Sequence, residues 1–186
     1  MKKIFLIITV IGAFIATSCE HEYENWYSAD YELSGEWVVT VQQSVDEYLY
    51  IFEDEGAMPN PANIESWEWD DIYGTGVTSV LTYNSAANIP TELIVDDNHT
   101  FWDYKVKVKA NNDVKTFEID ETPNLAYDDC DVSIIGGKVL KDAATTPSGN
   151  PADSIVFYVK FSDDSYGFTY MKVSGFRKTG FTEDEH

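Results

Sequence analysis

The sequence predicts an all-β protein, an antiparallel barrel or sandwich, and three observations support this fold class. Apolar and polar residues alternate with a period of two in eight or nine short segments, which is typical of half-buried strands. Clusters of Asp, Asn, Gly and Pro separate these segments as turns. No segment after residue 18 carries a sustained helical stripe or the spacing of βαβ units, so a parallel sheet is excluded.

The predicted strands follow in order along the chain. The first begins at Leu33, where Leu33, Gly35, Trp37 and Val39 alternate with mostly polar neighbours. The others are predicted at 48–52, 77–83, 92–95, 101–110, 114–119, 132–140, 154–162 and 168–178. In the strand at 101–110, Trp102, Tyr104, Val106 and Val108 share one face and lysines occupy the other. Residues 96–100 between two of the strands predict a hairpin turn.

One connection, residues 53–76, is much longer than the turns. Connections of this length inside a compact domain are commonly functional or carry structure of their own. Two interpretations remain open: a loop that folds its aromatic residues over one end of the barrel, or a lid that contacts a ligand.

The N-terminus predicts export and lipid attachment. Lys2 and Lys3 precede an apolar run that is too short to span a bilayer comfortably, as in a secretory signal peptide. Residues 16–19, Ala-Thr-Ser-Cys, resemble the lipobox of bacterial lipoproteins, with Ala16 in place of the usual Leu. That resemblance implies cleavage before Cys19 and attachment of several acyl chains, which together give stable membrane anchorage. We therefore expect a signal peptide at 1–18, a lipidated cysteine and acidic tether at 19–32, and one barrel domain at 33–186.

Charge and cysteine content exclude several classes of function. Cleavage removes two of the 12 basic residues and none of the 33 acidic ones, which leaves a formal net charge of −23. Such a chain repels nucleic acid and anionic headgroups, so membrane attachment is expected through the lipid alone. Only Cys130 remains after lipidation of Cys19, so no internal disulfide is possible. The acidic clusters do not match an EF-hand loop, and we expect no metal and no cofactor.

The first and last strands carry a paired motif. Gly35-Glu36-Trp37 resembles the G-x-W signature of lipocalins, in which the tryptophan closes one end of an up-and-down barrel beneath a basic residue of the last strand. Strand parity places Arg177 on the same side as Val173, whereas Lys178 points outward. We therefore expect Arg177 to stack on Trp37 and close the barrel.

A broader resemblance covers nearly the whole mature chain. Residues 33–37, 81–88, 101–108, 146–159 and 174–181 are similar to a family of Gram-negative outer-membrane lipoproteins labelled lipid-binding and in some cases hydrolases. The resemblance implies a single lipocalin-like, or calycin-like, up-and-down barrel of about eight strands. It also implies an outer-membrane location, and the acidic residues after Cys19 favour the cell surface.

The resulting hypothesis is a membrane-anchored protein that holds a small apolar or amphipathic, lipid-like molecule inside its barrel. The expected lining residues come from five of the predicted strands and are Val39, Leu81, Tyr83, Tyr104, Val106, Phe157, Val159, Met171 and Val173. The same stripe is also typical of a plain core.

Three alternatives remain. Trp67, Trp69 and Tyr73 in the long loop predict a stacking platform for carbohydrate. The protein could instead be an inhibitor or assembly module that uses an outer face of the barrel, and the sequence does not identify a protein partner. A hydrolase is the least supported, because His21, His99 and His186 lie in the tether, at a hairpin tip and at the C-terminus, and no G-x-S-x-G motif or zinc spacing is present.

Overall fold

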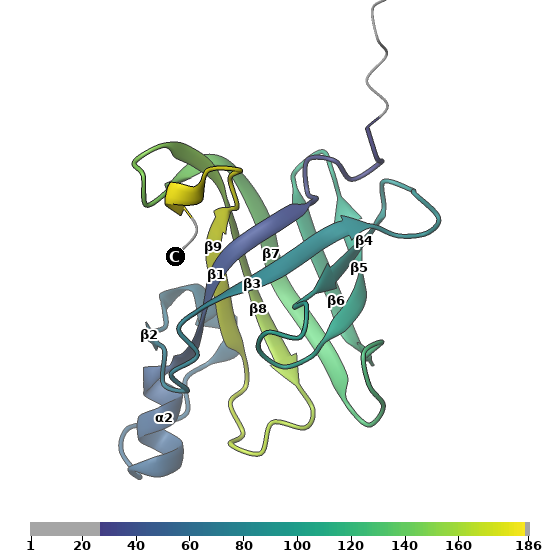
Figure 1. Ribbon diagram of the computed structural model, residues 1–186. Helices are drawn as coiled ribbons and strands as arrows, with labels where there is room; N and C mark the ends of the chain where they lie inside the picture. The colour runs from purple at the N-terminus through teal and green to yellow at the C-terminus, as the bar shows by residue number, and fades with distance from the viewer. Residues whose placement is uncertain (1–26, 185–186) are drawn as a thin grey trace, which may run out of the picture.

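A closed antiparallel barrel forms the body of the protein (Figure 1), in a computed structural model that describes residues 27–184. Its eight strands pair with their neighbours in the sequence, and β1 pairs with β9 to close the ring. Their bounds are β1 Gly35–Ser44, β3 Val77–Asn84, β4 Glu92–Asp96, β5 Lys105–Asn111, β6 Thr116–Pro123, β7 Asp131–Thr145, β8 Pro151–Phe161 and β9 Met171–Arg177. This connectivity confirms the predicted up-and-down barrel and removes the sandwich alternative.

Strand β1 closes the ring, because it pairs with β3 on one side and with β9, the last strand, on the other. Trp37 lies opposite Val80 of β3 and Arg177 of β9. Trp37, Val39 and Val41 point inward and are at most 1% exposed. Alternating apolar residues of the other strands meet them in one core cluster.

A short helix replaces one predicted strand. Residues 48–52 were expected to be extended, but α2 spans Val45–Phe52. Ser44 caps the helix, since its hydroxyl accepts a hydrogen bond from the Glu47 amide at 3.2 Å, and Asp46 and Glu47 occupy the first turn. The prediction was wrong because a short apolar run does not distinguish strand from helix.

The long loop carries structure of its own. It contains the 3₁₀ helix η1, Pro61–Ser66, and a two-residue strand β2, Trp69–Asp70, which pairs with the end of β1 at Gln43 and Ser44. Figure 1 shows α2 and this loop together beside one end of the barrel. We call this the α2 end, and the opposite end, where Trp37 and Arg177 meet, the Trp37 end.

One buried carboxylate shapes the β4–β5 hairpin at the α2 end. Asp97 is 1% exposed and accepts hydrogen bonds from the amides of His99, Phe101, Trp102, Asp103 and Tyr104 at 2.7–3.1 Å. These amides are therefore unavailable for strand pairing. The strand expected from residue 101 accordingly begins only at Lys105.

The last part of the predicted tether packs on the barrel. Asp30 and Leu33 are fully buried at the Trp37 end, and the Asn112 amide donates to the Asp30 carboxylate at 2.8 Å. A second 3₁₀ helix, η2 at Thr182–Asp184, follows β9. Cys19, His21, His186 and the predicted signal peptide lie outside the described residues.

Candidate functional site

Side chains fill the barrel interior. The largest fully buried ones include Trp37, Tyr104, Phe117 and Phe157, each at most 2% exposed. Seven of the nine expected lining residues belong to this packed core, and they are Val39, Tyr104, Val106, Phe157, Val159, Met171 and Val173. These residues are buried against one another and contribute to the stability of the core.

Leu81 and Tyr83 lie on the outer face, contrary to expectation. Val80 and Thr82 point inward instead. Thr82 is polar but satisfied, because its hydroxyl accepts from the Trp37 indole at 2.8 Å and donates to the Leu33 carbonyl at 2.6 Å. The hydroxyl of Tyr83 donates to Asp96 on the outer wall at 2.7 Å. The inward Thr82 hides the true parity of this strand from a reading based on hydrophobicity.

Arg177 lies over the indole of Trp37 at the Trp37 end. Its Cζ is 4.3 Å from the ring centroid, within the range of a cation–π contact. Its Nε donates to Asp153 at 3.1 Å. A Cβ at Gly35 of the G-x-W motif would overlap the guanidinium group, so Arg177 would have to shift to accommodate one.

The two loop tryptophans pack against the outer wall and do not form an open platform with Tyr73. Trp67 is 7% exposed and stacks on Trp69 with centroids 5.6 Å apart. Trp69 in turn contacts Tyr158 of β8 at 5.5 Å. Tyr73 contacts a different group of rings at the α2 end. The expected carbohydrate platform is therefore divided between two places.

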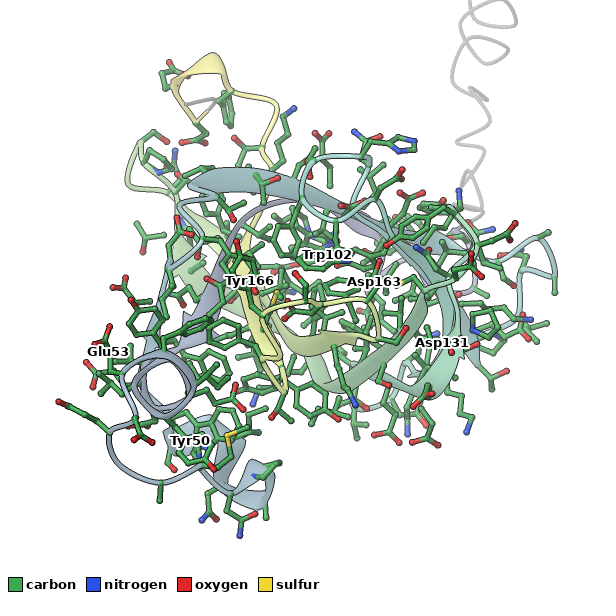
Figure 2. The ribbon with its side chains drawn as sticks, turned by 90° about the horizontal axis from the view of Figure 1, so that it is seen from below. Tyr50, Glu53, Trp102, Asp131, Asp163 and Tyr166 are labelled. Atoms are coloured by element: carbon green, nitrogen blue, oxygen red, sulfur yellow. The ribbon has the colours of Figure 1, made fainter. Side chains whose placement is uncertain are left out.

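An aromatic pocket lies at the α2 end, which Figure 2 views directly. It has a volume of about 440 Å³. Its lining comes from α2, the end of the long loop and the β8–β9 loop, and comprises Tyr48, Phe52, Ile72, Tyr73, Tyr166 and Phe168. In Figure 2, Tyr166 lies between α2, which carries Tyr50 and is followed by Glu53, and the barrel mouth at Trp102 and Asp163. Of the lining residues, only Tyr73 was a predicted site residue.

Two other hollows of the described surface are less suited to an apolar ligand. A groove of about 700 Å³ on the outer wall is crossed by an ion pair between Lys107 and Glu92 at 3.0 Å. A pocket of about 410 Å³ beside Gly137 includes the charged side chains of Glu65, Lys109 and Lys138. None of the six residues that line the aromatic pocket is charged.

Hydrogen bonds to buried and half-buried polar groups join the segments that line the aromatic pocket. Glu47 is fully buried, and its carboxylate accepts from the Thr169 amide at 3.2 Å. Burial raises the pKa of Glu47. The side-chain oxygen Oε1 of Gln43 accepts a hydrogen bond from the backbone amide of Tyr73 at 3.0 Å. The Tyr73 hydroxyl donates to the Asp164 carboxylate at 3.1 Å. These bonds fix the ring of Tyr73 relative to α2 and the β8–β9 loop.

A second polar cluster centres on Asp163. Its carboxylate accepts from the Trp102 indole at 3.0 Å, the Tyr127 hydroxyl at 2.5 Å and the Cys130 thiol at 3.2 Å. Burial opposes ionisation of Asp163, but these donors outweigh it and lower its pKa. Burial also raises the pKa of the Cys130 thiol.

Most of the chain matches a known protein family. The model of a family described as lipid-binding putative hydrolase matches residues 22–182. The chain belongs to this lipid-binding family. Among curated proteins the comparison found no match.

The hydrolase part of the family description finds no support at the Asp163 cluster. A nucleophilic cysteine needs a thiolate and a nearby base. Here the Cys130 thiol is held protonated, and the lowered pKa of Asp163 makes it a weak base. His99, the one histidine within residues 27–184, pairs with Asp103 on an exposed hairpin.

Residues 27–184 contain no group of three His, Cys, Asp or Glu side chains placed to hold a metal ion. Over the same residues, no helix is both long and apolar enough to cross a membrane.

One sequence pattern could have predicted part of the lining of the aromatic pocket, which the sequence analysis missed except for Tyr73. Ser44 followed by Asp46 and Glu47 is an N-cap pattern, and it would have predicted the helix that carries Tyr48 and Phe52. Phe168 falls at the start of the strand predicted at 168–178, but β9 begins only at Met171, and Phe168 lies with Tyr166 in the β8–β9 loop.

Proposed function

We propose that this protein is a membrane-anchored lipoprotein that binds a small apolar or amphipathic, lipid-like molecule in the aromatic pocket at the α2 end. The observation that carries the proposal is the pocket of about 440 Å³ lined by five aromatic rings and Ile72. This volume falls in the range of small-molecule sites, which are mostly apolar and few per protein. Membership of the lipid-binding family supports the same ligand class.

Exposure of the aromatic side chains also supports the proposal. Phe52 and Tyr166 are 44% and 56% exposed, and their rings lie 6.1 Å apart. Large apolar groups gathered in water are unfavourable, at about 25 cal/mol per Å² of apolar surface. A bound apolar chain would cover these rings and remove that cost.

Anchorage through Cys19 is the second part of the proposal. It rests on the signal-like N-terminus and the lipobox resemblance. The proposal includes a location in the outer membrane, on the cell surface. The described chain starts at the Trp37 end, where Asp30 and Leu33 are buried. An anchor before this point would place the aromatic pocket on the side facing away from the membrane.

Thermal stability in the presence of uncharged amphiphiles tests the binding. Decanol and related uncharged molecules should raise the unfolding midpoint of the full chain, because a ligand at 100 times its dissociation constant adds about 2.7 kcal/mol of stability. This corresponds to a few degrees for a chain of this size.

Variants locate the site. Phe52→Ala combined with Tyr166→Ala should abolish the shift. Tyr31→Ala removes a comparably exposed tyrosine, at 55%, from the Trp37 end and should leave the shift unchanged. Absence of a shift with every amphiphile, or a shift that survives the double substitution, would contradict the proposal.

A further inference from the structure

Basic side chains are absent from the segments that build the aromatic pocket. After Lys3 the next lysine or arginine in the sequence is Lys105. The α2 segment and long loop, residues 45–76, contain nine acidic residues and no lysine or arginine. The β8–β9 loop, residues 162–170, contributes Asp163 and Asp164 and again neither lysine nor arginine. The pocket is therefore built from segments that carry acidic side chains and no lysine or arginine.

The aromatic rings converge from three segments. Tyr73 lies 5.2 Å from Tyr166 and 5.6 Å from Phe168 between ring centroids. Phe52 lies 6.1 Å from Tyr166 and 6.2 Å from Phe168. Several ring faces within a few ångströms of one pocket provide the negative quadrupole that attracts a cation.

Hydrogen bonding strengthens this preference. The Tyr73 hydroxyl donates to the Asp164 carboxylate at 3.1 Å. Donation to a carboxylate increases the electron density of the phenol ring and places a negative charge directly beside it. Glu47, the residue before the lining residue Tyr48, adds a second carboxyl group between α2 and Thr169. The α2 helix also ends at Phe52, so the partial negative charge of its C-terminus lies at the same place.

We propose that the ligand of this pocket is a cationic amphiphile, an apolar chain with an alkylammonium head, rather than a fatty acid or another anionic lipid. This inference rests on the proposed function, since it assigns the head-group charge of the ligand expected there. The ammonium group lies against the rings of Tyr73 and Tyr166 and is balanced by Asp164. The chain covers Phe52 and Ile72. An anionic head group finds no basic side chain among the six lining residues.

A series of probes that share one chain length tests the inference. Decyltrimethylammonium, decanol and decanoate are titrated into the full chain below their micelle-forming concentrations, and binding is followed by calorimetry. One cation–π contact changes affinity by about twofold to thirtyfold. Decyltrimethylammonium should therefore bind at least about tenfold more tightly than decanoate, with decanol between them.

Substitution of Tyr166 separates the contribution of its aromatic ring to binding from the contribution of apolar contact area. Tyr166→Leu should weaken binding of decyltrimethylammonium about threefold to tenfold and leave decanol nearly unchanged, whereas Tyr166→Phe should retain the preference for the cation. Tyr31→Leu at the Trp37 end is the matched control and should change neither probe.

The outcomes distinguish the two proposals. If none of the three probes binds, the proposed function fails. If decanol or decanoate binds as tightly as the cation, or if Tyr166→Leu weakens all three probes equally, the cationic ligand is overturned while the apolar site remains.

Discussion

Arg177 closes the barrel through contacts that no other side chain reproduces. Its plane lies over Trp37, Nη2 donates to the Glu32 carbonyl at 3.1 Å, and Nη1 donates to the Ser34 carbonyl. Nε binds Asp153 at the same time. A lysine could satisfy only one of these positions, because its donors diverge from a single nitrogen. Arg177 therefore joins β9 to the chain segment that enters β1.

A double-mutant cycle measures the coupling between Trp37 and Arg177. Trp37→Phe and Arg177→Met should show a coupling free energy of about 1–2 kcal/mol in urea unfolding, because the cation–π contact is largely desolvated. Lys178→Met is the control, since Lys178 pairs with Glu36 on the surface at 2.9 Å and should not couple to Trp37. A coupling near zero for Arg177 would show that the indole and guanidinium contribute independently.

At the scale of elements, α2 is joined to the barrel by a buried carboxyl group. Glu47 bridges the helix to the β8–β9 loop through Thr169. Burial, and to a smaller extent the charge of Asp164, raises the pKa of Glu47 above its ordinary value of 4.5. The folded state therefore holds the proton more tightly than the unfolded chain does. Stability conferred by this group is lost as the pH rises from 4.5 through the folded-state pKa.

Glu47→Gln removes this ionisation while keeping an acceptor for the Thr169 amide. The variant should unfold at a higher temperature than the natural chain at pH 7, and the difference should shrink as the pH falls below 4.5. Glu53→Gln changes an exposed residue of the same segment and should have little effect at either pH. A Glu47→Gln effect of the same size at every pH would contradict the argument.

The pairing of β1 with β9 depends on a glycine. A Cβ at Gly175 would overlap the Val38 carbonyl oxygen and the Val39 backbone. Gly175→Ala should therefore lower the free energy of unfolding by about 1–3 kcal/mol, as overpacking does. Gly180→Ala is the control, because a Cβ there meets nothing within 4 Å. Equal effects of the two substitutions in urea unfolding would refute the steric explanation.

Across the whole molecule, the two ends of the barrel differ. The aromatic pocket and its acidic segments lie at the α2 end, whereas the described chain begins at the Trp37 end (Figure 1). The formal charge of −21 works against adsorption of the barrel to anionic lipid. Membrane attachment would then depend on the lipid at Cys19.

Fractionation of cells tests that dependence. Cys19→Ala should move the protein from the detergent-extracted membrane to the soluble fraction, because several acyl chains would be lost together. Cys130→Ala is the control, since this buried thiol lies in the barrel and should leave the partition unchanged. A Cys19→Ala protein that stays in the membrane would rule out lipid anchorage at this residue.

The sequence by itself determined the barrel and most of its inward face. Where apolar and polar residues alternate without interruption, as from Tyr104 to Val108, the period of two fixes which side chains meet in the core. It failed in the strand of Leu81 and Tyr83, because an inward Thr82 is satisfied only by partners from Trp37 and Leu33. A shift of one residue reverses every side chain of a strand.

Only the tertiary structure decided where a ligand could lie. The rings of Tyr48, Tyr73 and Tyr166 come from three segments that are far apart in the chain, and no local pattern marks them as neighbours. The structure also showed that core side chains fill the interior, which depends on how their volumes fit together. Local alternation determines which way a side chain points, whereas a pocket arises from what the assembled elements leave uncovered.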